Sequence, residues 1–144
     1  TKGQLETLVL APQMPELKLT PAEADDYLVI DYALLWPAAP GVVLLKSPGH
    51  TPGHQMVYVR LETGREYLLS GDVSWSYAGV SEARQRPPEQ SDRIREDRDA
   101  LGRQLDWLAA LARADEVTIV PSHDDVYLTR LVEQGALIEG IVVD

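Results

Sequence analysis

The sequence contains no cysteine. Disulfide bonds, thiolate metal sites and cysteine nucleophiles are therefore excluded, and any bound metal must be held by histidine nitrogens and carboxylate oxygens. The absence suits a reducing or an oxidising compartment equally. The compartment thus stays open, although the cytoplasm is favoured.

Positive charge is also scarce. Thirteen Lys and Arg residues stand against 23 Asp and Glu residues, which gives a formal net charge of −10, and no basic cluster reverses this sign locally. This argues against a nucleic-acid partner, because a phosphate backbone requires a basic surface. The sequence also lacks any apolar run long enough to cross a bilayer, so a membrane association is not expected.

What the sequence does contain is typical of one folded domain, predicted here over residues 1–144. The hydrophobic share of 44% argues against disorder. Strands are expected where short β-branched or aromatic runs end at proline or glycine, and helices where apolar residues recur at helical spacing. The predicted strands are residues 8–10, 27–35, 42–46, 55–61, 66–71, 116–120 and 137–143. The predicted helices are residues 92–114 and 124–134, the second starting at Ser122 or Asp124, and residues 73–90 are predicted to form a long loop. This order predicts an α/β (α+β) fold, a sheet with helices on its outer face.

Three predicted strands each end in a residue that can bind a metal. His50 follows residues 42–46, Asp72 follows residues 66–71 and His123 follows residues 116–120. Because α/β folds build their sites at the carboxyl ends of strands, these side chains should converge at one edge of the sheet if the strands are neighbours.

The chemistry of this set suits a divalent metal. Neutral imidazole and carboxylate bind zinc at about 2.0–2.2 Å, and a carboxylate can also bridge two ions. Gly49 and Gly71 each stand directly before a candidate ligand, where the missing side chain permits a tight turn and leaves space around an ion.

Three segments together resemble a known family. Residues 47–54 read SPGHTPGH, residues 70–72 read SGD and residues 121–123 read PSH. In this order they resemble the last three metal-ligand motifs of the metallo-β-lactamase-fold hydrolases, and the resemblance covers nearly the whole chain from Tyr27 onward. It implies the C-terminal half of an αββα sandwich, with a mixed sheet and helices on one face.

The resemblance also implies roles for these residues. His50 would bind the first of two zinc ions, His123 would bind the second, and Asp72 would bridge both. Asp72 would also act catalytically by orienting a metal-bound hydroxide that attacks an ester, lactone or thioester bond. His54 has no ligand role in this pattern, and we expect it to bond to the backbone or support its loop.

One feature of the family is missing from the sequence. The His-x-His-x-Asp-His motif, which lies upstream in family members, does not occur here. The chain is expected to begin just after that motif, to bind zinc weakly by itself and to be inactive alone. We also expect it to pair with its missing N-terminal half, or to self-associate, because a bared inner sheet face would be apolar.

The substrate is expected to be a small molecule. The PSHD stretch and the loop with Trp75 and Tyr77 resemble the acyl-homoserine-lactone lactonases, although Trp75 stands where those enzymes have a tyrosine. Thioester hydrolysis of the glyoxalase II kind stays open. Trp75 and Tyr77 could line a substrate pocket or fill an interface with the missing half.

Each of these residues also has an ordinary interpretation. A histidine after Pro-Gly is often a hydrogen-bonded loop residue, and Asp72 could simply cap a turn. The charged stretch 92–99 is interpreted as the solvated start of a helix. The competing hypothesis is therefore a metal-free binding or structural module derived from the same fold.

Overall fold

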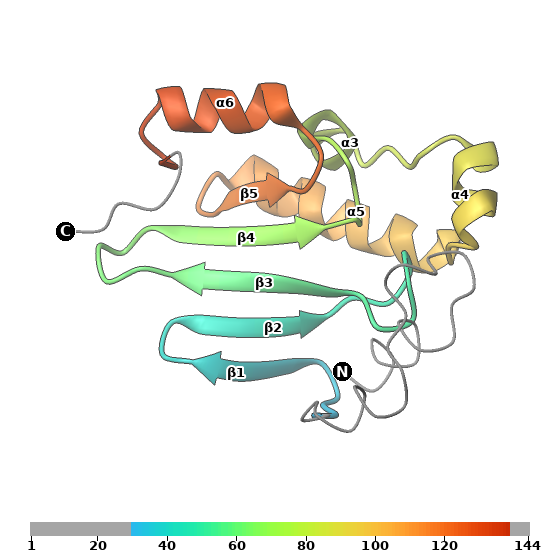
Figure 1. Cartoon of the computed structure of the whole chain (residues 1–144), viewed down its shortest axis with the longest axis horizontal. Helices are drawn as coiled ribbons and strands as arrows, with labels where there is room; N and C mark the ends of the chain where they lie inside the picture. Colours follow the sequence, from blue (N-terminus) through green and yellow to red (C-terminus); the bar gives the residue numbers. More distant parts are fainter. Residues whose placement is uncertain (1–29, 139–144) are drawn as a thin grey trace, which may run out of the picture.

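The structure, a computed structural model, describes residues 30–138. Its five strands form one mixed sheet in the order β1-β2-β3-β4-β5 (Figure 1). The first four strands pair antiparallel, and β5 pairs parallel to β4. The strands are β1 (Leu35–Ala39), β2 (Val42–Lys46), β3 (Gln55–Arg60), β4 (Glu66–Gly71) and β5 (Thr118–Pro121). This confirms the predicted mixed sheet.

Within residues 30–138, four helices accompany the sheet. They are α3 (Tyr77–Ser81), α4 (Pro88–Ile94), α5 (Arg98–Ala114) and α6 (Asp125–Glu133). In Figure 1 the long helix α5 runs behind the strands, and α6 lies along the β5 side of the sheet. No helix within residues 30–138 is both long and apolar enough to span a membrane.

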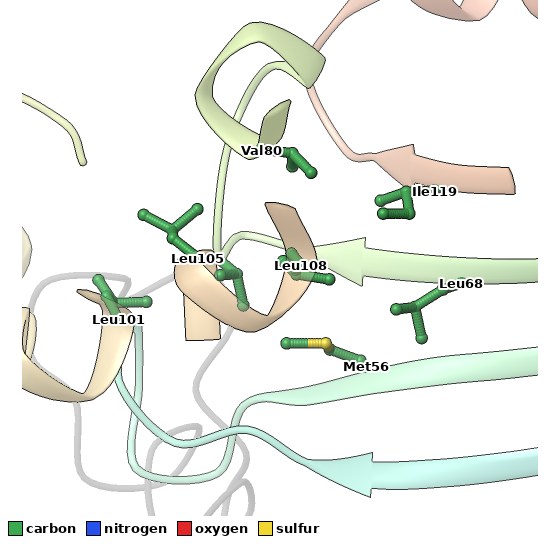
Figure 2. Close-up of a cluster of buried hydrophobic side chains, with 8 residues drawn as sticks. Met56, Leu68, Val80, Leu101, Leu105, Leu108 and Ile119 are labelled. Atoms are coloured by element: carbon green, nitrogen blue, oxygen red, sulfur yellow. The ribbon is translucent and has the colours of Figure 1, made fainter. Parts of the chain in front are cut away.

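The hydrophobic core lies between α5 and one face of the sheet. Leu101, Leu105 and Leu108 recur at helical spacing along α5 and are buried. They pack against Met56 of β3 and Leu68 of β4 (Figure 2). The core cluster is completed by Val73, Val80 and Ile119. This packing fixes α5 to the central strands and so positions the loops at their ends.

The opposite face of the sheet carries an apolar row, one residue from each strand. The strand register aligns Trp36 with Leu44, Leu44 with Val57, Val57 with Leu69, and Leu69 with Val120. None of these side chains is fully buried, and Leu69 is 39% exposed. Strand residues alternate between faces, and Leu68, beside Leu69, belongs to the core, so the row lies away from α5.

Two predicted strands differ from the structure. The strand predicted at residues 27–35 is wrong at residues 30–34, which are not strand, and only its last residue, Leu35, lies in β1. β1 also runs through Pro37, which an edge strand tolerates because its outer side needs no N–H donor. Residues 137 and 138 are not strand either. The rest of that predicted strand, and the one at residues 8–10, lie outside the described residues.

The helix predicted at residues 92–114 is two helices. α4 ends at Ile94, because its C-cap Arg95 has a left-handed backbone (φ 62°). α5 starts after Asp97, which accepts a hydrogen bond from the N–H of Ala100. The predicted loop 73–90 likewise contains the short helix α3, capped by Ser76, and the first residues of α4. Both misses have the same cause: these boundaries are set by caps rather than by apolar spacing.

The remaining elements agree with prediction to within two residues. The strand at residues 42–46 and the hairpin of β3 and β4 are confirmed, with Gly64 of the connecting turn at φ 84°. α6 is confirmed with Asp124 as its N-cap. β5 extends to Pro121 rather than ending before it. These elements deliver the candidate ligands.

Candidate functional site

Three loops meet at the carboxyl ends of β2, β4 and β5. The arrows of these strands point to the same end of the sheet in Figure 1. The loop after β2 carries His50 and His54, β4 runs directly into Asp72, and β5 is followed by His123. Parallel pairing of β4 with β5 is what brings the last two loops side by side.

The carboxylate of Asp72 lies between the two predicted histidine ligands. Its Oδ2 is 3.2 Å from Nε2 of His50, and its Oδ1 is 3.0 Å from Nε2 of His123. Ser122 donates a hydrogen bond of 2.6 Å to the same Oδ1. The structure therefore brings His50, Asp72 and His123 together, as their positions after three strands predicted.

His54 holds the backbone of Asp72. Its Nε2 accepts a hydrogen bond of 2.9 Å from the Asp72 N–H, and its Nδ1 lies 3.1 Å from the Ser47 carbonyl and 2.7 Å from the Ser47 hydroxyl. The ring thus carries its proton on Nδ1, and burial lowers the pKa of His54. His54 makes these contacts as the sequence analysis expected of a supporting residue.

Gly71 is required by this arrangement. Its φ of +55° is in the left-handed region, and a Cβ at this position would lie 2.6 Å from Nε2 of His54. The tight turn predicted at Gly71 is therefore present, and the missing side chain makes room for the His54 ring. That it also leaves space around an ion stays a prediction.

A buried glutamate that the sequence analysis missed completes the site. Glu96, with a side chain only 1% exposed, accepts a hydrogen bond at Oε1 from Nδ1 of His50, 2.8 Å away. Nη1 of Arg86 lies 3.2 Å from the same oxygen. The interpretation of residues 92–99 as a solvated helix start is thus wrong at Glu96. Asp97, the N-cap of α5, follows Glu96 directly, but no residue in the sequence marks the left-handed turn at Arg95 that precedes Glu96.

The charges of the cluster stabilise one another. Burial alone would lower the pKa of His50, but its contacts with Asp72 and Glu96 outweigh burial and raise that pKa above 6.5. The contact with His50 holds the pKa of Asp72 far below its usual range against the opposing effect of burial, and Ser122 acts in the same direction. An ionised carboxylate between imidazoles is therefore the favoured state.

Trp75 lies beside the cluster and Tyr77 does not. The Trp75 ring meets His123 edge-on, with centroids 5.9 Å apart, and its face lies 4.6 Å from the Arg86 guanidinium carbon. A cavity of about 490 Å³ adjoins it, lined by Ser74, Trp75, Ser76, Gly79, Arg84, Gln85, Arg86, Pro87, Pro88 and Arg98. Tyr77 instead stacks on Tyr127 of α6 at 4.1 Å. A substrate-binding role for either residue stays a prediction.

Known proteins resemble this chain in a short segment and in fold. No family model matches the sequence. An N-acyl homoserine lactonase of Bacillus thuringiensis is 46% identical over 37 residues, which make up 26% of this chain and 15% of that protein. A lactonase of a Bacillus species is 49% identical over the same length. The sequence similarity is thus confined to about a quarter of the chain.

Solved structures extend the likeness to most of the chain. An N-acyl homoserine lactone hydrolase, solved with the product N-hexanoyl-L-homoserine at its catalytic metal centre, superimposes with a TM-score of 0.70 at 20% identity, over 90% of this chain and 47% of that one. A quorum-quenching N-acyl homoserine lactone hydrolase gives a TM-score of 0.65 at 21% identity, over 88% and 48%. This chain has the metallo-β-lactamase fold. It spans about half the length of the structures that it matches.

The donors of this metallo-β-lactamase-fold chain fit a metal centre in kind but do not complete one. His50 and His123 each contribute one imidazole nitrogen, and a different oxygen of Asp72 lies beside each of these nitrogens. Within residues 30–138, no group of three or more His, Asp or Glu side chains is arranged to hold a single ion. Two donors for each of two ions is fewer than the three protein ligands of a catalytic zinc site. The further ligands that each ion needs must come from other residues.

Proposed function

We propose that this chain carries part of a two-metal centre of a hydrolase that cleaves a lactone or a related ester. The observation that carries the proposal is the placement of Asp72, whose two oxygens each face a different histidine. The N-acyl homoserine lactonases that share the fold support the reaction class. Zinc is the metal that best suits imidazole and carboxylate donors in this combination.

The residues would divide the two ions between them. His50 Nε2 and Asp72 Oδ2 form one pair of donors, and His123 Nε2 and Asp72 Oδ1 form the other. Bound divalent ions would supply Lewis-acid activation of water and of the scissile carbonyl. Asp72 would bridge the two pairs and hold them at a fixed separation, and Ser122 orients its Oδ1.

The substrate would approach from the side of Trp75. This residue touches His123 and lines the adjoining cavity, so a group placed against its ring would also lie near the Asp72 cluster. A lactone hydrolase of the same fold, solved with its product N-hexanoyl-L-homoserine, favours a lactone over a thioester. Tyr77 is turned toward α6 and would act on substrate only indirectly.

The remaining ligands would be supplied by a segment with the His-x-His-x-Asp-His pattern. Such a segment would belong to an N-terminal half of the fold. It would pack on the open face of the sheet, the face opposite α5 that no described element covers, or self-association would cover that face instead. The apolar row from Trp36 to Val120 supports a sheet-to-sheet contact of this kind. Activity of the isolated chain is not expected, because its donors form two half-sites.

A metal-free binding or structural module is the second candidate. It is favoured by the direct contacts of both histidines with Asp72, which already give each carboxylate oxygen a polar partner without an ion. In such a module the cluster would be a buried polar network that ties three loops together.

Zinc binding by the purified chain separates the two candidates. A hydrolase fragment should bind zinc weakly, and titration should shift the NMR signals of His50 and His123. Asp72→Asn should abolish those shifts, whereas Asp106→Asn, an exposed change on α5, should leave them intact.

A second measurement tests the reaction. The chain mixed with a polypeptide that supplies the His-x-His-x-Asp-His segment should hydrolyse N-hexanoyl homoserine lactone, and Asp72→Asn should lose that activity. If zinc disturbs neither histidine, the metal-free module is correct. If the chain alone forms a tight two-zinc complex, the half-site argument is wrong.

A further inference from the structure

The buried carboxylate of Glu96 bonds to the far side of the His50 ring. His50 has two ring nitrogens, and the structure gives each its own partner: Nε2 faces Asp72, while Nδ1 lies 2.8 Å from Glu96 Oε1. Both carboxylates can accept a hydrogen bond from a protonated ring. When the ring holds a single proton, the contact with Glu96 is the shorter one (2.8 Å against 3.2 Å) and involves the more buried carboxylate, so Nδ1 is the donor. The His50 side chain is itself only 10% exposed, so water competes little for this bond.

This contact determines which ring nitrogen is free to bind a metal. A histidine ligand typically donates its second N–H to a carboxylate or carbonyl, which fixes its tautomer and orientation. We infer that Glu96 is a positioning residue that holds the proton of His50 on Nδ1 and directs the Nε2 lone pair into the site. Metal binding by that lone pair rests on the proposed function, whereas the position of the proton on Nδ1 does not.

Arg86 extends the same support to the rest of the site. Its Nη1 lies 3.2 Å from Glu96 Oε1 and 3.3 Å from the Val73 carbonyl, and its Nη2 donates to the Asp72 carbonyl. Its guanidinium also covers the face of Trp75. A single buried cation therefore fixes the carboxylate behind His50, the backbone of Asp72 and the ring beside His123.

The chain geometry explains how a glutamate reaches this place. Arg95 adopts the left-handed conformation, and the N–H of Asp97 then bonds to the Gly49 carbonyl at 2.9 Å, in the loop that carries His50. Glu96 stands between these two anchors. The α4–α5 junction is thus attached to the His50 loop by one backbone bond and one side-chain bond.

The first test is the tautomer of His50 in the metal-free chain. Long-range ¹H–¹⁵N NMR spectra, recorded with the ring neutral, should show the Nδ1–H form, with Nε2 unprotonated. Glu96→Ala should return the ring to a mixture of tautomers. The isosteric Glu96→Gln, which keeps an acceptor oxygen, should retain the Nδ1–H form. Asp92→Asn, an exposed change on α4, is the matched control and should leave the spectrum unchanged.

The second test is zinc affinity. Glu96→Ala should weaken zinc binding by about 10- to 100-fold, as expected when the partner of a ligand histidine is lost, with a smaller loss for Glu96→Gln and none for Asp92→Asn. A purely structural Arg86–Glu96 ion pair would change the unfolding midpoint without moving the tautomer.

The outcomes separate this inference from the proposed function. An Nε2–H tautomer in the wild-type chain, or an unchanged tautomer in folded Glu96→Ala, would overturn the positioning role even if zinc binds. The wild-type spectrum alone gives that answer should Glu96→Ala not fold. If the tautomer depends on Glu96 but zinc never binds, the positioning role stands and the hydrolase proposal fails.

Discussion

At the scale of single residues, the site depends on contacts made behind the groups that face the substrate. His54 bonds to the Asp72 N–H, and its ring fills the space that a side chain at Gly71 would take. Gly71 also adopts a positive φ. Backbone conformation and side-chain packing therefore both select glycine at the same position, directly before Asp72.

Gly71→Ala should therefore lower the free energy of unfolding by more than the backbone strain of alanine at a positive φ. A non-glycine residue in the left-handed region costs about 1–2 kcal/mol, and loss of the His54–Asp72 bond adds about 1 kcal/mol. We expect a fall in the free energy of unfolding of about 2–3 kcal/mol by urea denaturation.

Gly64→Ala is the matched control, because Gly64 also has a positive φ (84°) but nothing lies within 4 Å of its Cβ position. It should lose only the conformational part. Equal losses in the two variants would show that the His54 ring moves away at no cost.

Sequence reasoning found the residues that follow strands and missed the residue that follows a cap. The sequence predicts the ends of three strands, because their β-branched and apolar runs stop at proline or glycine. These strand ends place His50, Asp72 and His123 at one edge of the sheet. Glu96 could not be placed in this way, because its burial depends on the left-handed turn at Arg95, and an arginine gives no local signal of that conformation. Charge alone therefore predicted an exposed side chain.

At the scale of elements, α3 and α6 are joined by aromatic stacking behind the site. The rings of Tyr77 and Tyr127 lie 4.1 Å apart and nearly parallel, and the Tyr77 N–H donates to Asp124, the N-cap of α6. Burial and the neighbouring Tyr77 raise the pKa of Tyr127 to about 12. This junction fixes the start of α6, which follows His123 directly.

Alkaline pH should loosen this junction. The phenol of Tyr127 ionises near its ordinary value of 10.0 when unfolded but only near about 12 when folded. Stability that is present below pH 10 is therefore lost progressively as pH rises toward the folded pKa.

Urea denaturation of the chain and of Tyr127→Phe tests this effect. The wild type should be the more stable protein, and its advantage over Tyr127→Phe should narrow as pH rises from about 9 to about 11. Only the wild type has a phenol at position 127 that can ionise in this range. A difference that stays constant over that range would contradict the raised pKa.

At the scale of the whole molecule, one face of the sheet is covered by α5 and the other presents an apolar row. Trp36, Leu44, Val57, Leu69 and Val120 align across all five strands of the described sheet. A contiguous apolar surface of this kind is a frequent mark of an interface. The mixed sheet and its helical layer were predictable from element order, but the partner of the open face depends on residues that this sequence does not identify.

We therefore expect the purified chain to associate through this face. Sedimentation velocity at micromolar concentration should show dimers or larger species, or a co-purified partner. Leu69→Lys should shift the chain toward monomer by placing a charge within the row, at its most exposed residue. Val126→Lys, at a site on α6 that is 74% exposed, should not. A stable wild-type monomer without a bound partner would show that the open face needs no cover.

The position of the supporting groups also has a genetic consequence. Ser47, His54, Arg86, Glu96 and Ser122 hold the three candidate ligands in place, and all of them lie within residues 47–123. A recombination event that exchanges this stretch whole keeps each ligand with the group that orients it. A crossover between Asp72 and Glu96 would instead join a histidine from one lineage to a carboxylate from another. Viable recombinant genes should therefore carry their breakpoints outside this stretch.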